Sequence, residues 1–167
     1  MITPFIILLL LSGPLALTYF YSRLTRQALH LGKPASWGLG LAFIFFFIGH
    51  FAKTEGMIEM LPSWIPFRFE LVYLTGILEL LIGIALFIPN YQVVASKIAI
   101  VVFVAFFPAN IYAALNSVGL GGHQWGVVYL LIRGPLQIIL ILWAYFLCIK
   151  NYNKVLNSQI ILVSPSR

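Results

Sequence analysis

The sequence predicts an all-α membrane protein with five transmembrane helices. Of its 167 residues, 62% are hydrophobic and only 8% are charged, and the mean hydropathy of +1.01 lies far above that of soluble globular domains. Five segments are long and apolar enough to cross a hydrocarbon core of ~30 Å, which takes about 20 helical residues. Lys and Arg lie singly near the ends of these segments. Topology therefore accounts for the net charge of +6, and we expect no nucleic-acid partner.

The predicted spans divide the chain into three parts. The spans run from Pro4 to Tyr21, Ser36 to Phe51, Glu70 to Ile88, Val93 to Leu115 and Val127 to Ile149. Residues 1–35 form an N-terminal transmembrane helix with a basic cytoplasmic loop, residues 36–150 a four-helix bundle, and residues 151–167 a cytoplasmic tail. A cleaved secretory signal is an open alternative for the first span, because Ala16 follows a hydrophobic run. Its N-terminal flank has no Lys or Arg, which favours a retained helix.

The distribution of basic residues predicts the orientation. With the first loop inside, the cytoplasmic side carries Arg23, Arg26, Lys33, Lys97, Lys150, Lys154 and Arg167. The other side carries Lys53 and Arg68, and Arg133 is set aside because it lies within the fifth span. Cytoplasmic loops are enriched in Lys and Arg. We therefore expect the N-terminus outside and the C-terminus inside, in a bacterial inner membrane with the lipid bilayer as a partner.

The connection from Lys53 to Phe69 is too apolar for a fully solvated loop, and Pro62 and Pro66 prevent a continuous helix. We expect it to lie in the membrane interface, where it is either a surface-bound connector or a functional lid. The glycine-rich loop from Ser117 to Gly126 is expected to be flexible and external.

The third span carries a carboxylate at its centre. On a helix, Val72, Gly76, Glu79 and Gly83 share one face, so the glycines let a neighbouring helix approach Glu79 closely. An ionisable side chain at bilayer depth is costly and normally faces protein or a cavity, where it has a partner. We therefore expect Glu79 to point into the helix bundle.

Four spans place polar side chains in the outer half of the membrane. At a rise of ~1.5 Å per residue, Glu79 lies roughly 13 Å deep, Arg133 roughly 9 Å, Gln137 roughly 15 Å and Asn110 roughly 8 Å, and His50 lies near the outer end of its span. We expect Glu79 to pair with Arg133, and Gln137 and Asn110 to complete the hydrogen bonds of an apolar small-molecule cavity. The inner half has almost no polar residues. Interhelical hydrogen bonds that only hold the bundle together are the alternative.

Metal chemistry has little support in the sequence. Cys148 is the only cysteine, which excludes an intrachain disulfide and a multi-cysteine metal site. His50 alone is typical of a helix end, although with His123 it could supply two metal or haem ligands. We expect no metal site and assign no catalytic residue.

Five short motifs occur in an order that resembles the DoxX-like family of small membrane proteins. They are Gly49 to Phe51, Met60 to Pro66, Leu71 to Pro89, Phe107 to Asn116 and Arg133 to Gln137, and the resemblance covers Trp37 to Ile149. It implies a four-helix bundle to which the helix from Pro4 to Tyr21 is an addition. It also points to His50, Glu79, Asn110, Arg133 and Gln137. Some members of that family are linked to quinone-coupled sulfur oxidation or membrane oxidoreductases, and others look like assembly factors.

The leading functional hypothesis is a subunit of a membrane redox system that binds a quinone or another small amphipathic molecule. Arg133, Gln137 and Asn110 would hydrogen-bond its oxygens, and Glu79 would hold or relay a proton. As an enzyme the chain would be at most a membrane subunit of an oxidoreductase. The alternative is a non-enzymatic assembly factor or chaperone for a larger membrane protein complex. A proton-coupled transporter is less favoured, because the inner half offers no polar path beyond Gln137.

Overall fold

The computed structural model describes residues 2–27, 31–118 and 122–151, and within these ranges the chain forms helices and no strand. Five of the helices are long and apolar enough to cross a membrane: Thr3–Thr25, Gly32–Ala52, Arg68–Phe87, Pro89–Leu115 and Gln124–Lys150. Each contains one of the five predicted spans, to within a few residues at either end. The predicted fold class is therefore confirmed.

The helices follow one another with short connections. In order they are α1 (Thr3–Thr25), α2 (Gly32–Ala52), α3 (Thr54–Glu59), α4 (Arg68–Phe87), the 3₁₀ turn η1 (Pro89–Tyr91), α5 (Gln92–Leu115), the 3₁₀ helix η2 (His123–Tyr129), α6 (Leu130–Leu142) and the π-helix η3 (Trp143–Lys150). The fifth span is thus a tight 3₁₀ turn, an α-helix and a wider π-helix in sequence. We call the end of the bundle that carries α3 the α3 end, and the opposite end the η1 end.

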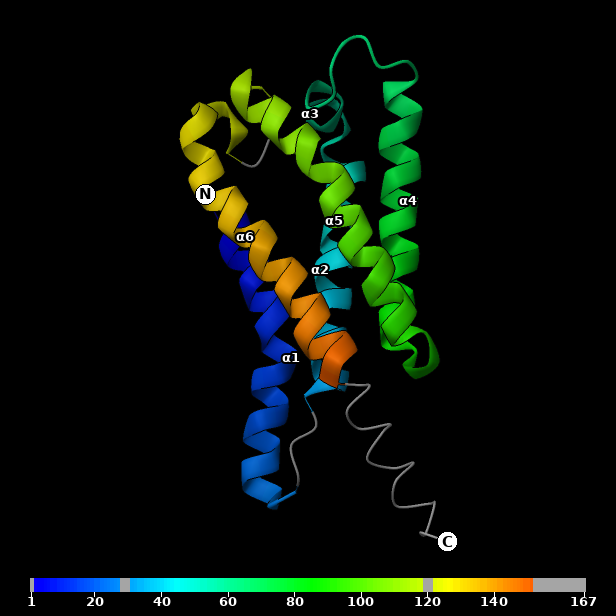
Figure 1. Cartoon of the computed structure of the whole chain (residues 1–167), viewed down its shortest axis with the longest axis vertical. Coiled ribbons are helices and arrows are strands. Elements are labelled where there is room, and N and C mark those ends of the chain that lie inside the picture. The colour runs from blue at the N-terminus through cyan, green and yellow to red at the C-terminus, as the bar shows by residue number, and fades with distance from the viewer. Residues whose placement is uncertain (1, 28–30, 119–121, 152–167) are drawn as a thin grey trace, which may run out of the picture.

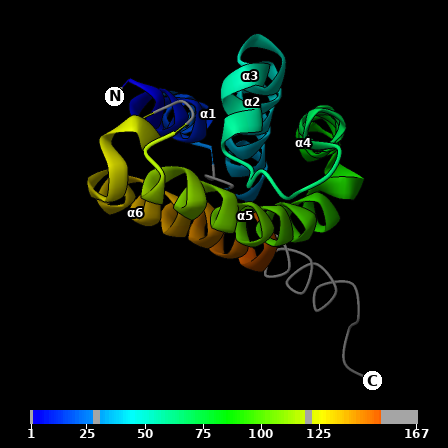
Figure 2. The same cartoon turned by 90° about the horizontal axis from the view of Figure 1, so that it is seen from above.

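The long helices form two layers. Figure 2 shows α1, α2 and α4 side by side, with α5 and α6 crossing them as a second layer. The most extensive contact is between α2 and α4, followed by that between α1 and α2, and η3 joins the layers by packing on both α2 and α5. The core between the layers is apolar and rich in aromatic rings, with Phe43 and Phe103 at 5.1 Å between ring centroids.

Glycines set the spacing within the first layer. A Cβ at Gly83 would lie 3.2 Å from the carbonyl oxygen of Gly40, so these two residues let the backbones of α2 and α4 meet. A Cβ at Gly38 would overlap the carbonyl oxygen of Leu11, so α1 touches α2 backbone to backbone there. Small residues permit such close approach between membrane helices. The prediction that glycines on the Glu79 face admit a neighbouring helix is confirmed.

The connection between α2 and α4 is only partly packed. The short helix α3 contacts α2 and α4, with Gly56 buried, and Figure 1 shows it at one end of the bundle. Further along, Trp64 is 80% and Phe67 is 75% exposed. Two large apolar side chains that no helix covers fit the expected position of this loop in the membrane interface.

Candidate functional site

Glu79 lies on the buried face of α4 and meets His50, near the end of α2. The Nε2 atom of His50 and the Oε2 atom of Glu79 are 3.1 Å apart, and the two residues are 9% and 5% exposed. Gly76 makes this contact possible, because a Cβ there would lie 2.8 Å from the Cβ of His50. The imidazole therefore occupies space that any larger residue at position 76 would need.

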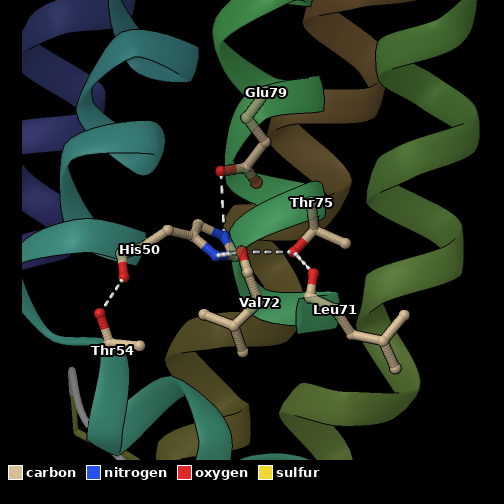
Figure 3. Close-up of polar contacts among 6 residues, drawn as sticks. All are labelled: His50, Thr54, Leu71, Val72, Thr75 and Glu79. Carbon is tan, nitrogen blue, oxygen red and sulfur yellow. Dashed lines mark hydrogen bonds and ion pairs between the residues drawn. The ribbon is translucent and has the colours of Figure 1, made fainter. Parts of the chain in front are cut away.

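The other ring nitrogen of His50 carries a hydrogen. Its Nδ1 atom lies 2.8 Å from the carbonyl oxygen of Val72, as Figure 3 shows. Because a carbonyl oxygen only accepts hydrogen bonds, Nδ1 must carry a hydrogen and donate it. Nε2 and Oε2 can then be bonded only if one proton lies between them, either on an imidazolium facing a carboxylate or on a carboxylic acid facing a neutral ring. The Oε2 atom of Glu79 is buried and has no other hydrogen-bond partner among the described residues, so a proton shared with His50 would satisfy it.

The predicted pairing of Glu79 with Arg133 is wrong. Arg133 is half-buried, and its Nε atom donates to the Oδ1 atom of Asn110 at 3.2 Å. Asn110 in turn donates through Nδ2 to the carbonyl oxygen of Phe106 at 2.9 Å. Arg133 still attracts the Glu79 carboxylate electrostatically, but from beyond ion-pair distance. The reason is the packing order, since α2 lies directly on α4 whereas α6 lies beside α5.

Gln137 has hydrogen-bonding capacity that the described residues leave unused. Its Nε2 atom donates to the carbonyl oxygen of Phe103. Its Oε1 atom is buried and has no hydrogen-bond partner among the described residues, and the whole residue is 5% exposed. A buried acceptor without a donor costs about 1–3 kcal/mol. A donor supplied from outside the chain would recover this energy.

The five predicted site residues therefore form two groups. His50 and Glu79 join α2 to α4, while Asn110, Arg133 and Gln137 line the contact between α5 and α6. The main-chain carbonyl oxygens of Phe103 and Phe106 accept hydrogen bonds from the second group. The expected cavity among these groups stays a prediction. A separate cavity lies between α1 and the start of α2.

The expectation that the other half of the bundle has almost no polar groups is wrong. Ser36, Gln92, Ser96 and Cys148 are all at least nine-tenths buried near the η1 end. The Cys148 thiol lies close to the hydroxyl groups of Ser36 and Ser96, and Ser96 donates to the carbonyl oxygen of Gln92 at 2.7 Å. Sequence reasoning missed this cluster because short hydroxyl side chains satisfied within their own helices are unremarkable in a span. The signal that could have revealed the cluster is that α2, α5 and η3 each place a small polar side chain at the same depth.

No group of three or more His, Cys, Asp or Glu residues that could hold a metal ion occurs in the described part of the chain. The alternative in which His50 and His123 together bind a metal or haem involves the side chain of His123, which lies outside the described residues. The cytoplasmic tail, residues 152–167, also lies outside them.

A family model matches residues 39–148 and is described as a domain of unknown function, DUF8561. The match starts within α2 and ends within η3, so it includes all five predicted site residues and leaves out α1. No curated protein and no solved structure matches the chain.

Proposed function

The chain belongs to the DUF8561 family, a domain of unknown function, and we propose that it binds the polar head of a quinone-like or other small amphipathic molecule as a subunit of a membrane redox system. The observation that carries this proposal is the Oε1 atom of Gln137, a buried acceptor with no donor among the described residues. The resemblance to the DoxX-like family, some of whose members are linked to quinone chemistry, gives further support.

An unsatisfied acceptor distinguishes a ligand site from interhelical hydrogen bonds that only hold helices together. Polar groups within a bilayer are satisfied by other protein groups, because lipid offers no substitute for water. His50 meets this expectation fully, with partners for both ring nitrogens. Gln137 does not. A ligand hydroxyl group donated to Oε1 of Gln137 would complete its hydrogen bonds.

The residues around Gln137 suit a headgroup that carries both carbonyl and hydroxyl oxygens. Arg133 lies one helical turn from Gln137 on the same face of α6, and its guanidinium group can donate five hydrogen bonds. A proton shared between His50 and Glu79 would be within the electrostatic reach of Arg133. In this proposal the chain binds the headgroup and holds a proton, and the electrons come from a partner subunit.

The test is to purify the protein in mild detergent and to measure co-extracted quinones by mass spectrometry. We expect a quinone-class molecule in stoichiometric amount with the wild type. Gln137→Leu should lose it, because the replacement removes the acceptor while keeping an apolar side chain of similar size. Gln92→Leu is the matched control, since Gln92 is also buried but bonds the carbonyl oxygen of Leu86 at the other end of the bundle. Equal quinone content in the wild type and Gln137→Leu would refute the proposal, as would its absence from the wild type.

A second candidate is a non-enzymatic assembly factor for a larger membrane complex. The observation that favours it is α1, which lies outside the family match and buries only Pro4, Ile7 and Leu11. Most of this helix therefore remains available to a partner protein. A stoichiometric partner in native purification, lost when α1 is replaced by an unrelated transmembrane helix and accompanied by no bound small molecule, would favour this function.

We also propose that the N-terminus lies outside and the C-terminus inside the cytoplasmic membrane of a bacterium. Support comes from the bias of Lys and Arg toward the η1 end, which carries Arg23, Arg26, Lys33, Lys97 and Lys150. Reporter fusions test this orientation, since a C-terminal green fluorescent protein should fluoresce and a C-terminal alkaline phosphatase should be inactive. The opposite pattern would invert the proposed topology.

A further inference from the structure

The first two helices touch closely and then part. α1 buries residues only in its first half, up to Leu11, where Gly38 of α2 meets it. Beyond that contact no residue of α1 is buried, and Figure 1 shows α1 running on past the start of α2. Beyond Leu15, which still packs against the core, α1 therefore extends away from the bundle at the η1 end (Figure 1).

A groove of about 270 Å³ occupies the space where the helices part. It is lined by Ser12, Leu15, Ala16, Tyr19, Phe20 and Leu31. Both hydroxyl groups among these residues have partners, since Ser12 donates to the carbonyl oxygen of Leu8 at 2.7 Å and Tyr19 accepts from Arg23. The groove thus offers almost nothing to a polar ligand and suits a stretch of hydrocarbon chain.

Two cations close in sequence to the lining residues are held by aromatic rings. Arg23 lies with its guanidinium carbon 5.6 Å from the ring centre of Tyr19, and its Nε atom donates to the Tyr19 hydroxyl at 3.2 Å. Lys33, two residues from the lining residue Leu31, places its Nζ atom 5.3 Å from the ring centre of Trp37. Cation–π contacts of this kind restrict where a long basic side chain points.

No acidic side chain competes for these cations. The sequence contains four acidic residues, Glu55, Glu59, Glu70 and Glu79. Three of them lie in α3 or at the start of α4, and the fourth faces His50. These two cations therefore have no neutralising partner among the acidic side chains of the chain.

We propose that the groove between α1 and α2 is a binding site for an anionic phospholipid. One acyl chain lies along Leu15, Ala16 and Phe20, and the phosphate lies between Arg23 and Lys33. This site is separate from that of the proposed redox ligand and does not depend on it. The lipid would fill the space between the two helices and fix the second half of α1 against the bundle.

The experiment compares two lipids with the same acyl chains, dioleoyl phosphatidylglycerol and dioleoyl phosphatidylcholine, added to the delipidated protein and counted by native mass spectrometry. We expect the wild type to retain phosphatidylglycerol preferentially. A basic residue near a membrane surface contributes enough attraction to an anionic lipid that Arg23→Gln and Lys33→Gln should each lower the preference roughly fivefold. Ala16→Trp should lower the retention of both lipids, because the indole fills the groove.

The matched control is Lys97→Gln, which removes the same charge from an exposed position near the same end but outside the groove. It should keep the preference of the wild type. If Lys97→Gln lowered the preference for phosphatidylglycerol as much as Arg23→Gln does, only the overall positive charge would matter. If Ala16→Trp left lipid retention unchanged, no lipid would occupy the groove. Either result overturns the proposal. Should Ala16→Trp not fold, the comparison of Arg23→Gln and Lys33→Gln with Lys97→Gln still decides, and equal retention of the two lipids by the wild type would also overturn the proposal.

Discussion

The contact between His50 and Glu79 depends on the missing side chain at Gly76, which makes Gly76→Ala the sharpest test of the site. The new Cβ would lie 2.8 Å from Cβ and 3.2 Å from Cγ of His50. Cβ of His50 is fixed to the α2 backbone, so relief requires α2 and α4 to separate. Overpacking of this kind costs typically ~1–3 kcal/mol, whereas replacing a helical Gly by Ala gains about 1 kcal/mol in helix propensity.

Gly49→Ala provides the matched control. It introduces the same methyl group one residue before His50, but there the Cβ meets only Cε of Met57, at an ordinary 3.5 Å. Gly49→Ala should therefore gain about 1 kcal/mol from propensity, and Gly76→Ala should be less stable than this control by roughly 1–3 kcal/mol. The free energy of unfolding is measured by sodium dodecyl sulfate titration in mixed micelles, followed by circular dichroism.

A second measurement follows the histidine itself. Nitrogen NMR of the wild type should report a protonated Nδ1 atom for His50, bonded to Val72, and Gly76→Ala should alter that signal. Equal stability of the two alanine variants together with an unchanged His50 signal would refute the packing on which the site is built.

Three further predictions use the same unfolding assay or the same micelles. Gln137→Leu should leave the free energy of unfolding unchanged or raise it, because it removes an unsatisfied acceptor. Asn110→Ala should lower the free energy of unfolding by about 1–3 kcal/mol, because it removes the acceptor of the Arg133 hydrogen bond. A larger loss in Gln137→Leu than in Asn110→Ala would contradict the hydrogen-bond assignments. Gly38→Ala should destabilise more than any other alanine variant here, because its Cβ would overlap a carbonyl oxygen of α1. Cys148 is fully buried, so a maleimide should label it only after unfolding; rapid labelling of the native protein would place it elsewhere.

Much of the architecture could be read from the sequence because membrane helices obey two strong constraints. A span needs about 20 apolar residues, which fixed the number and approximate limits of the helices. A charged residue within a span must face protein, which oriented α4 with Glu79, Gly76 and Gly83 toward its neighbour. Both constraints act along a single helix, so they can be applied to the sequence without knowing how the helices pack.

The partner of Glu79 could not be predicted in the same way, because it depends on which helices are neighbours. Depth along the membrane placed Arg133 and His50 near the same level as Glu79, and the opposite charge of Arg133 made it the obvious choice. The glycine contact of Gly40 with Gly83 instead brings α2 against α4. A glycine at the level of a histidine on the next helix is the signal that would have favoured His50.

The hydrogen bond from His50 to the main chain of Val72 also limits where a proton can travel. A histidine passes protons onward by taking one at one nitrogen and releasing another from the opposite nitrogen, and a peptide oxygen is far too weak a base to receive the released one. The imidazole can consequently exchange a proton with Glu79, but it cannot pass that proton on through its other nitrogen. Any proton that leaves this pair must depart by the carboxylate side.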